Sequence, residues 1–264
     1  MVVSILGCGW YGKALAIELI KKGITVKGST TSAEKIAALE ADGIRPYLIN
    51  ISPENKVIED DFFTCDILWI SIPPKARTGK GLAYIAQLKA LISIIKERGI
   101  QQVVLISSSG IYGDNNTVLT EMDEPNPDSE AGRILLEAEN MLKVETSFIT
   151  TVIRFAGLIG SDRDPGRFFA GKTGIPNGDA PVNLIHLIDC LGISCSIIEK
   201  KAFGNTYNAV APQHPTRAEF YTNAAERSGL EKPQFISEKK SWKIIESMNV
   251  PALLDYVYKM NLTE

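Results

Sequence analysis

The chain is poor in cysteine and histidine, which limits the kinds of site that it can build. It has four cysteines and two histidines in 264 residues. No two cysteines form a Cys-x-x-Cys pair, and the two histidines share no metal-ligand spacing. The sequence therefore argues against a disulfide scaffold and against a metal site. It favours free thiols in a reducing, cytoplasmic setting.

Long apolar runs and basic clusters are also missing. No run reaches the roughly 20 apolar residues of a membrane span, and the first residues lack the basic start of a signal peptide. The 28 Lys and Arg against 31 Asp and Glu give a net charge of −3 without a Lys/Arg cluster. Nucleic acid and membranes are thus not expected as partners, whereas a small-molecule substrate is. The composition does not indicate an oligomeric state.

What the sequence does contain is an alternation of short apolar runs with helical patterns. The runs are almost continuously apolar, which is typical of parallel strands buried on both faces of a sheet. Helices between such strands predict a Rossmann-type, doubly wound α/β fold. The predicted strands are 2–6, 24–26, 47–51, 67–72, 103–107, 147–155 and 205–209. The predicted helices are 14–22, 82–98 and one that a capping box at Thr31–Glu34 opens and that ends near 42–43.

The composition changes after the sixth of these strands. Residues 157–181 are rich in Gly, Pro, Arg and Asp and show little periodicity. We therefore expect a dinucleotide-binding domain over 1–156 and a mixed C-terminal region over 157–264. That region would form a small substrate-facing lobe and return at least one strand, near 205–209, to the main sheet. The cations of the loop could hold an anionic substrate, although a solvated loop of mixed charge is the commoner arrangement; they are Arg163, Arg167 and Lys172.

A glycine fingerprint links the first predicted strand to the first helix. Gly7, Gly9 and Gly12 fit Gly-x-Gly-x-x-Gly in the strand-to-helix context that gives this pattern its meaning. Gly7 would allow the tight turn, Gly9 would admit a pyrophosphate, and Gly12 would let the helix pack closely. We expect Trp10 and Tyr11 to cover the pyrophosphate, which would lie at the positive end of the helix.

The end of the second strand bears on the choice of cofactor. NAD sites place Asp or Glu about 20 residues after the glycines, but residues 28–32 contain no acid. Hydroxyl groups tolerate a 2′-phosphate, and Lys27 or Lys35 could neutralise it. NADP is therefore preferred over NAD, unless these residues only cap the next helix, as Thr31 is expected to do. The predicted contacts are Ser29, Thr30 and Thr31.

Several further segments resemble the extended short-chain dehydrogenases/reductases, the NAD-dependent epimerase/dehydratase group. With the glycine fingerprint, they span most of the chain in the order of that family; they are 66–74, 107–114, 154–160 and 181–189. The resemblance implies a nicotinamide cofactor that contacts Ile72, Pro73 and Ser107. It also implies that Ser108, four residues before Tyr112, hydrogen-bonds the reacting oxygen of the substrate. Ser108 could equally end its strand and satisfy local backbone groups.

The chain departs from this family at its Tyr-x-x-x-Lys motif, in which the tyrosine transfers the proton. None of the eight tyrosines has a lysine four residues later. Matching Glu137 to the glutamate that follows the family motif puts Ser129 at the tyrosine position and Arg133 at the lysine position. The resemblance then implies that Arg133 reaches the nicotinamide ribose. An aliphatic hydroxyl is too weak an acid to replace a phenol, so Ser129 is expected to cap the helix.

Two functions follow from these patterns. The first is an NAD(P)-dependent oxidoreductase, similar to epimerases and dehydratases, that acts on a small and perhaps sugar-like substrate without the usual tyrosine. The second is an NAD(P)-binding regulator or redox sensor that has lost catalysis. A purely structural protein is hard to reconcile with three retained glycines.

Overall fold

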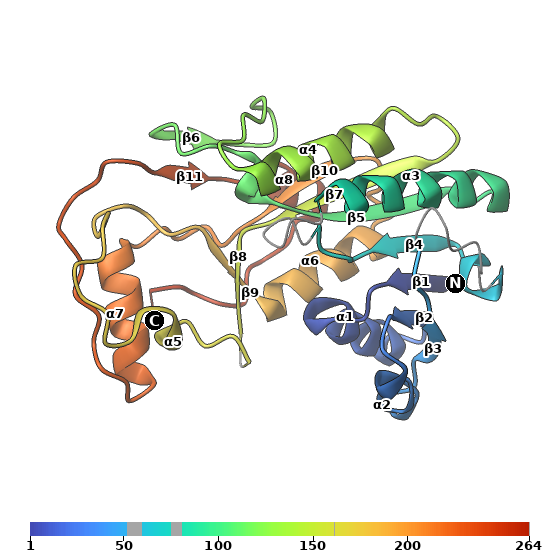
Figure 1. Cartoon of the computed structure of the whole chain (residues 1–264), viewed down its shortest axis with the longest axis horizontal. Helices are drawn as coiled ribbons and strands as arrows, with labels where there is room; N and C mark the ends of the chain where they lie inside the picture. The colour runs from blue at the N-terminus through green and yellow to red at the C-terminus, as the bar shows by residue number, and fades with distance from the viewer. Residues whose placement is uncertain (52–59, 75–80, 161, 264) are drawn as a thin grey trace.

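A seven-stranded parallel sheet forms the centre of the molecule (Figure 1). The computed structural model describes residues 1–51, 60–74, 81–160 and 162–263. The strand order is β3-β2-β1-β4-β5-β7-β10, and all neighbours are parallel. This order confirms the predicted Rossmann-type fold. The strands are β1 (Val2–Leu6), β2 (Thr25–Thr30), β3 (Arg45–Leu48), β4 (Ile67–Ile70), β5 (Gln102–Ser108), β7 (Ile149–Phe155) and β10 (Thr206–Ala209).

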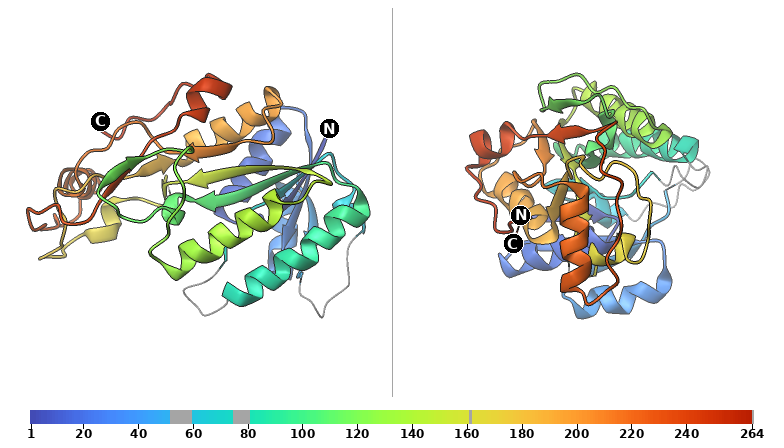
Figure 2. Two further views of the ribbon diagram at one scale, coloured as in Figure 1. Left: turned by 90° about the horizontal axis from the view of Figure 1, so that it is seen from above. Right: turned by 90° about the vertical axis from the view of Figure 1, so that its left-hand side faces the viewer.

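Helices cover both faces of this sheet, as the two side views show (Figure 2). One face carries α3 (Gly81–Arg98) and α4 (Glu130–Lys143). The other carries α1 (Trp10–Lys21), α2 (Ile36–Ala41), α6 (Leu187–Glu199) and α8 (Asn249–Leu254). Successive residues of β5 serve the two cores in turn: Val103 and Leu105 pack toward α3 and α4, and Val104 packs toward α1 and α6. Burial on both faces explains why the strands are continuously apolar.

The second strand is longer than its apolar run because two polar residues of β2 are buried with partners. Lys27 donates from Nζ to the backbone oxygen of Thr64 at 2.9 Å and pairs with Asp61 at 3.3 Å. The Ser29 hydroxyl accepts a hydrogen bond from the backbone N–H of Gly7 at 2.9 Å. Paired polar groups can be buried at little net cost, so the strand continues through them.

The predicted capping box at Thr31–Glu34 is wrong. The chain enters α2 through a short 3-10 turn, η1 (Ala33–Lys35), whose N-cap is Ser32 and makes no side-chain cap bond. Thr31 is exposed. The Thr30 hydroxyl instead accepts a hydrogen bond from the backbone N–H of Ser32 at 3.1 Å. The turn therefore begins one residue later than the pattern suggested.

A small lobe lies beyond the carboxyl ends of the central strands (Figure 1). The strand expected near 205–209 does return from it to the main sheet, as β10, which pairs with β7. Two short sheets and two helices build most of the lobe: β6 (Thr117–Leu119) with β11 (Lys243–Ile245), β8 (Gly157–Ile159) with β9 (Leu184–His186), α5 (Gly166–Phe169) and α7 (Arg217–Arg227). Of the remaining 3-10 turns, η4 (Ser109–Ile111) follows β5 at its carboxyl end, whereas η2 (Asp60–Phe63) precedes β4 at its amino end, away from the lobe.

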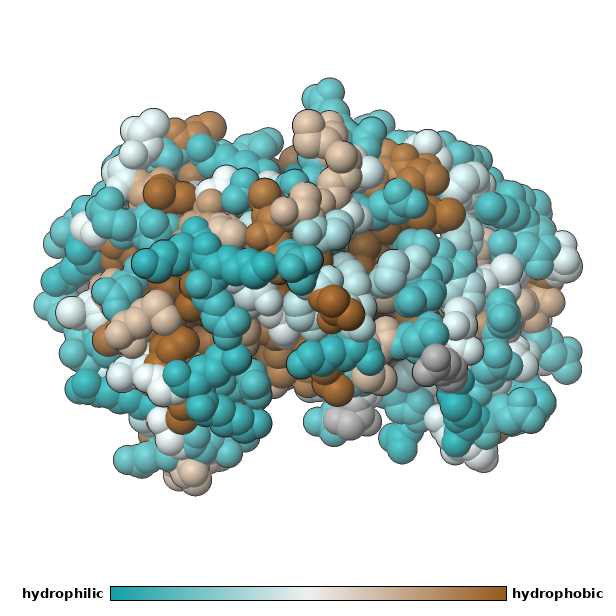
Figure 3. All heavy atoms as spheres, turned by 180° about the vertical axis from the view of Figure 1, so that it is seen from behind, coloured by the Kyte–Doolittle hydropathy of each residue, from teal (hydrophilic) through white to brown (hydrophobic). Residues whose placement is uncertain are grey.

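Hydrophilic residues predominate on the face seen in Figure 3, and the apolar residues there form small separate groups. Within the described part of the chain, no helix combines the length and apolar character needed to cross a membrane.

Candidate functional site

The three glycines of the fingerprint have different structural roles in the turn between β1 and α1. Gly7 has a φ of +103°, and a Cβ there would lie 2.9 Å from Cγ2 of Ile72. A Cβ on Gly12 would lie 2.3 Å from the backbone oxygen of Gly7, so only glycine lets the helix approach this closely. A Cβ on Gly9 would meet nothing within 4 Å. Packing therefore requires the first and third glycines, and the second leaves space over the turn.

The N-terminus of α1 faces this space without a neutralising group. Gly9 is the N-cap and makes no side-chain cap bond, and the first turn of α1 contains no acidic residue. The first N–H groups of a helix lack intrahelical partners and carry a partial positive charge. The turn can therefore bind an anion such as a pyrophosphate.

A cavity of about 660 Å³ continues from the glycine turn along the ends of β2, β3 and β4. One part of its wall is polar and comes from Ser29, Thr30, Thr31 and Lys35; another part is apolar and includes Ile49, Ile51, Ile72 and Pro73. The described residues that line it include no Asp or Glu. Tyr84 also lines it, and its buried hydroxyl has no hydrogen-bond partner among the described residues. The cavity thus has a cationic, hydroxyl-rich region and an apolar region.

Of the two lysines that were candidates to neutralise a 2′-phosphate, one is buried with other partners and the other lines the cavity. Lys27 is buried, and its amine is occupied by Asp61 and by the backbone of Thr64. It therefore cannot reach a ligand, and that part of the prediction is wrong. Lys35 lines the cavity, next to Thr30 and Thr31.

Tyr11 does not cover the glycine turn, which corrects another expectation. It is buried between α1 and α6, where its hydroxyl lies 2.6 Å from the Ser194 hydroxyl. Its ring meets Phe155 edge-on at 4.9 Å. Burial raises the pKa of this phenol well above its ordinary value. Trp10, one residue earlier, is only partly buried and lies beside the small lobe, with the Arg163 guanidinium 4.5 Å from its ring centre.

The end of β5 contains a buried polar network. The Ser107 hydroxyl donates to Oε1 of Glu139 at 2.6 Å, and Nη2 of Arg154 donates to Oε2 at 2.7 Å. Arg154 also donates to the Tyr112 hydroxyl, which donates to the backbone oxygen of Thr120 at 2.8 Å. The expectation that Ser107 contacts the cofactor is therefore not supported, because its hydroxyl points into this interior network.

Burial and charge within the network shift two pKa values in opposite directions. Burial raises the pKa of Glu139, but hydrogen bonds and charge from Arg154 outweigh burial, so the pKa lies below its ordinary value. Burial raises the pKa of Tyr112 against the opposing charge of Arg154. Tyr112 is thus a poor proton donor, held for structural reasons. Sequence reasoning missed Glu139 and Arg154, although an arginine inside an apolar strand was a usable signal for a buried partner.

Ser108 is the last residue of β5, at the carboxyl edge of the sheet. It is partly buried and caps η4, where its hydroxyl oxygen accepts a hydrogen bond from the backbone N–H of Gly110 at 3.1 Å. The hydroxyl proton stays available to a substrate oxygen. Both interpretations of Ser108 from the sequence are therefore compatible with its geometry.

Helix α4 confirms one expectation and does not support another. Ser129 is its N-cap and accepts a hydrogen bond from the N–H of Gly132 at 3.1 Å, as predicted. Arg133 is exposed, and its guanidinium contacts the backbone oxygen of Asp128 at 3.5 Å instead of turning toward the sheet. The buried face of the helix carries Leu135 and Glu139. The predicted role of Arg133 at a nicotinamide ribose therefore has no geometric support.

The buried glutamate also changes the alignment with the family motif. Glu139 bonds β5 and β7, whereas Glu137 is exposed. Matching Glu139 to the family glutamate moves the tyrosine and lysine positions to Ala131 and Leu135. Neither side chain can transfer a proton.

Cys8 in the glycine turn and His186 at the start of α6 both have shifted pKa values. Burial raises the pKa of Cys8 to about 12, so its thiol stays protonated. His186 caps α6 by accepting from the N–H of Ile188 at 3.2 Å, and burial lowers its pKa. Among the described residues no group of three or more His, Cys, Asp or Glu could hold a metal ion.

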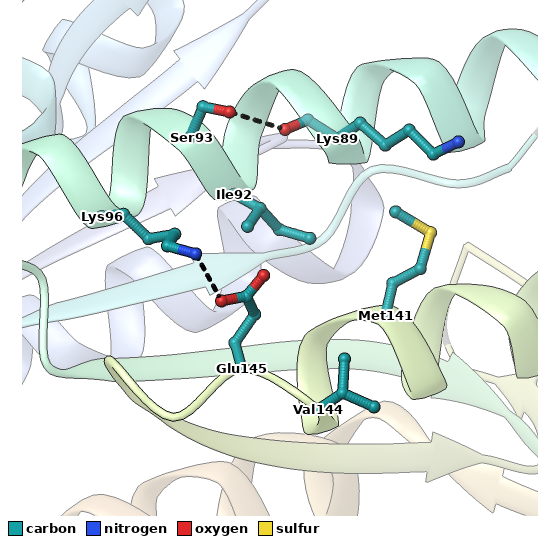
Figure 4. Close-up of a pocket in the computed structure, with 7 residues that line it drawn as sticks. All are labelled: Lys89, Ile92, Ser93, Lys96, Met141, Val144 and Glu145. Carbon is teal, nitrogen blue, oxygen red and sulfur yellow. Dashed lines mark hydrogen bonds and ion pairs between the residues drawn. The ribbon is translucent and has the colours of Figure 1, made fainter.

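A second depression of about 600 Å³ lies between α3 and α4 (Figure 4). Ile92, Met141 and Val144 line it, and Lys96 pairs across it with Glu145 at 2.8 Å. It lies toward the C-terminal ends of both helices. In a parallel sheet these ends stand at the amino edge of the strands, opposite the glycine turn. The depression is therefore separate from the candidate site.

Comparison with known proteins identifies relatives in sequence and solved structures with a similar fold. No family model matches the chain. It is 36% identical over 263 residues to protein YeeZ of Escherichia coli K12, covering 97% of this chain and 95% of the relative. A UDP-glucuronic acid 4-epimerase from Bacillus cereus in complex with NAD has a TM-score of 0.83 at 19% identity, over 100% of this chain and 95% of the other. A short-chain dehydrogenase/reductase superfamily protein from Agrobacterium tumefaciens with bound NAD has a TM-score of 0.81 at 15% identity, over 99% and 94%. These likenesses establish an extended short-chain dehydrogenase/reductase fold.

Proposed function

The chain belongs to the family of protein YeeZ, and we propose that it binds a nicotinamide dinucleotide and acts as an oxidoreductase on a small molecule. One observation carries the proposal. The open space over Gly9 lies at an acid-free helix N-terminus and continues into a cavity with a cationic and an apolar region. The solved structures with this fold that were crystallised with NAD support it.

Each part of the cofactor has a matching part of the site. The N–H groups at the start of α1 would hold the pyrophosphate. The apolar wall, with Ile49 and Ile51, would enclose the adenine. The Tyr84 hydroxyl has no hydrogen-bond partner among the described residues, and the adenosine half of the ligand would supply one. When bound, the nicotinamide would supply or accept a hydride.

NADP fits the end of β2 better than NAD. Ser29, Thr30 and Thr31 present hydroxyl groups there, and Lys35 adds a cation. No carboxylate among the described lining residues would repel a 2′-phosphate or hold a free ribose 2′-hydroxyl.

Ser108 would hold the substrate by donating its hydroxyl proton to the oxygen at the reacting carbon. Its own oxygen is fixed by Gly110, so the direction of the O–H is restricted. The likeness to a sugar-nucleotide epimerase makes a sugar-like substrate the first class to test.

One observation favours a second function, that of a dinucleotide-binding regulator or redox sensor without catalysis. When Glu139 is matched to the family glutamate, the partly buried Ala131 and the buried Leu135 stand at the positions of the proton-transferring pair, and neither side chain is ionisable. A protein of this kind would bind the cofactor tightly and turn nothing over.

Titration of NADPH and NADH into the purified chain tests the proposal. Gly9→Val should weaken binding by more than about tenfold, because its side chain would fill the space over the turn. Thr216→Val is a matched control: it removes the N-cap hydrogen bond of α7 in the small lobe, at a cost of about 1 kcal/mol, without touching the turn. Equal affinity of Gly9→Val and the wild type would overturn the proposal.

Ser108→Ala separates the two functions. An enzyme should lose most of its turnover of carbonyl or alcohol substrates and keep its affinity for NADPH. Tight cofactor binding, with no turnover by the wild type across such substrates, would favour the sensor.

A further inference from the structure

The Arg163 side chain differs from the other cations of the 157–181 loop in having no acidic or carbonyl partner among the described residues. Arg167 pairs with Asp164 at 3.7 Å, and Lys172 donates to the backbone oxygen of Phe168 at 3.0 Å. The Arg163 side chain has no hydrogen bond or ion pair with any residue that the structure describes, and the residue is exposed. Its guanidinium lies over the indole of Trp10, 4.5 Å from the ring centre.

The backbone fixes this position. Arg163 donates its N–H to the oxygen of Gly160 at 2.9 Å and accepts from the Gly160 N–H at 3.3 Å. A Cβ on Gly160 would lie 3.1 Å from Cζ2 of Trp10 and 3.3 Å from Cβ of Leu187. The lobe thus packs closely against Trp10, and the lack of a side chain at Gly160 makes this contact possible.

Trp10 connects the cation to the cofactor site. It is the first residue of α1 and directly follows Gly9, over which the space for an anion lies. A guanidinium stacked on an aromatic ring keeps its in-plane N–H donors free, and these match the geometry of phosphate oxygens. Arg163 therefore presents unpaired donors at the end of α1 where the helix N–H groups are also open.

We propose that Arg163 binds the pyrophosphate of the dinucleotide from the small lobe, opposite the N-terminus of α1. This inference rests on the proposed function. It assigns the loop cation a phosphate ligand, and it makes Trp10 the platform that orients the guanidinium. The lobe would then hold the cofactor as well as the substrate.

The experiment compares NADPH and ADP-ribose binding by the wild type, Arg163→Ala, Arg163→Lys and Arg167→Ala. Arg163→Ala should weaken both ligands by about tenfold, the effect of losing one charged contact at an exposed site. The lysine variant should recover only part of this loss, because an ammonium cannot make two parallel bonds. Arg167→Ala, an exposed arginine of the same loop, should bind as the wild type does.

Salt dependence supplies a readout that altered folding would not move. The affinity of Arg163→Ala for NADPH should fall less steeply with ionic strength than that of the wild type, since one ion contact is missing. Equal affinities and equal salt slopes for Arg163→Ala and the wild type would overturn the inference and leave the proposed function standing. A wild type that binds neither ligand would instead refute the proposed function.

Discussion

Replacing Arg154 by methionine should destabilise the fold by about 3 kcal/mol. The side chains of Arg154 and Glu139 are 4% and 0% exposed, and three hydrogen bonds of 2.7, 3.1 and 3.3 Å join them. Removing one partner of a buried pair costs about 3–5 kcal/mol, because the other charge is left buried. Glu139 would keep Ser107 at 2.6 Å and Lys143 at 3.2 Å, which places the loss near the low end of that range.

The pH dependence of this loss has a definite sign. In the wild type, the pKa of Glu139 is lowered in the folded state. Its ion pair therefore stabilises the fold above the unfolded pKa of about 4.3, and this stability is lost as the pH falls through the folded pKa. Without Arg154, burial dominates and raises the pKa of Glu139. Protonation then removes the unpaired charge, so the difference between Arg154→Met and the wild type should shrink as the pH falls from 7 toward 5.

Urea denaturation at both pH values measures the effect. The double variant Arg154→Met, Glu139→Gln should be more stable at pH 7 than Arg154→Met alone, because no charge remains buried. A loss below about 1 kcal/mol for Arg154→Met, or an equal loss at both pH values, would refute the reasoning.

Two other substitutions test neighbouring parts of the site. Ser129→Ala should lower the free energy of unfolding by about 1 kcal/mol through loss of its N-cap hydrogen bond, and it should leave NADPH affinity unchanged. Thermal melting and a titration measure the two effects. An altered affinity would place Ser129 at the cofactor. Lys35→Ala should weaken the binding of NADPH by about fivefold and that of NADH by much less, because only NADPH carries the 2′-phosphate. Calorimetry at one ionic strength measures both affinities. An unchanged ratio of the NADPH and NADH affinities would mean that another group binds the phosphate.

The central sheet could be predicted because its signal is local in the sequence. Each continuous apolar run, closed by a glycine or a turn, marks a strand buried on both faces. The extension of β2 could not be predicted in this way, since Lys27 and Ser29 are buried with partners that lie 37 and 22 residues away in the chain. The burial of Tyr11 likewise depends on Ser194, which only the packing of α1 on α6 brings close.

The alignment of α4 failed for a related reason, and its correction bears on function. Glu137 and Glu139 are equally plausible from sequence, but two residues turn an α-helix by about 200° and so exchange its buried and exposed faces. Ser107 and Arg154, which come from two strands, identify Glu139 as the buried glutamate. If the family's tyrosine and lysine were introduced according to the alignment on Glu137, by Ser129→Tyr and Arg133→Lys, they would therefore occupy the N-cap and the exposed face of α4. The same residues introduced by Ala131→Tyr and Leu135→Lys would share the face of Glu139.

Helix α4 thus brings no ionisable side chain to the positions where the family keeps its proton-transferring pair. In the proposed enzyme, we expect the Ser108 hydroxyl at the end of β5 to hydrogen-bond the substrate oxygen, because its proton has no acceptor among the described residues. A serine hydroxyl can orient and polarise a carbonyl, but its pKa lies too far above neutral for it to act as the general acid alone. Turnover of carbonyl and alcohol substrates by the wild type therefore decides between enzyme and sensor, and its loss in Ser108→Ala would identify Ser108 as the residue that holds the substrate.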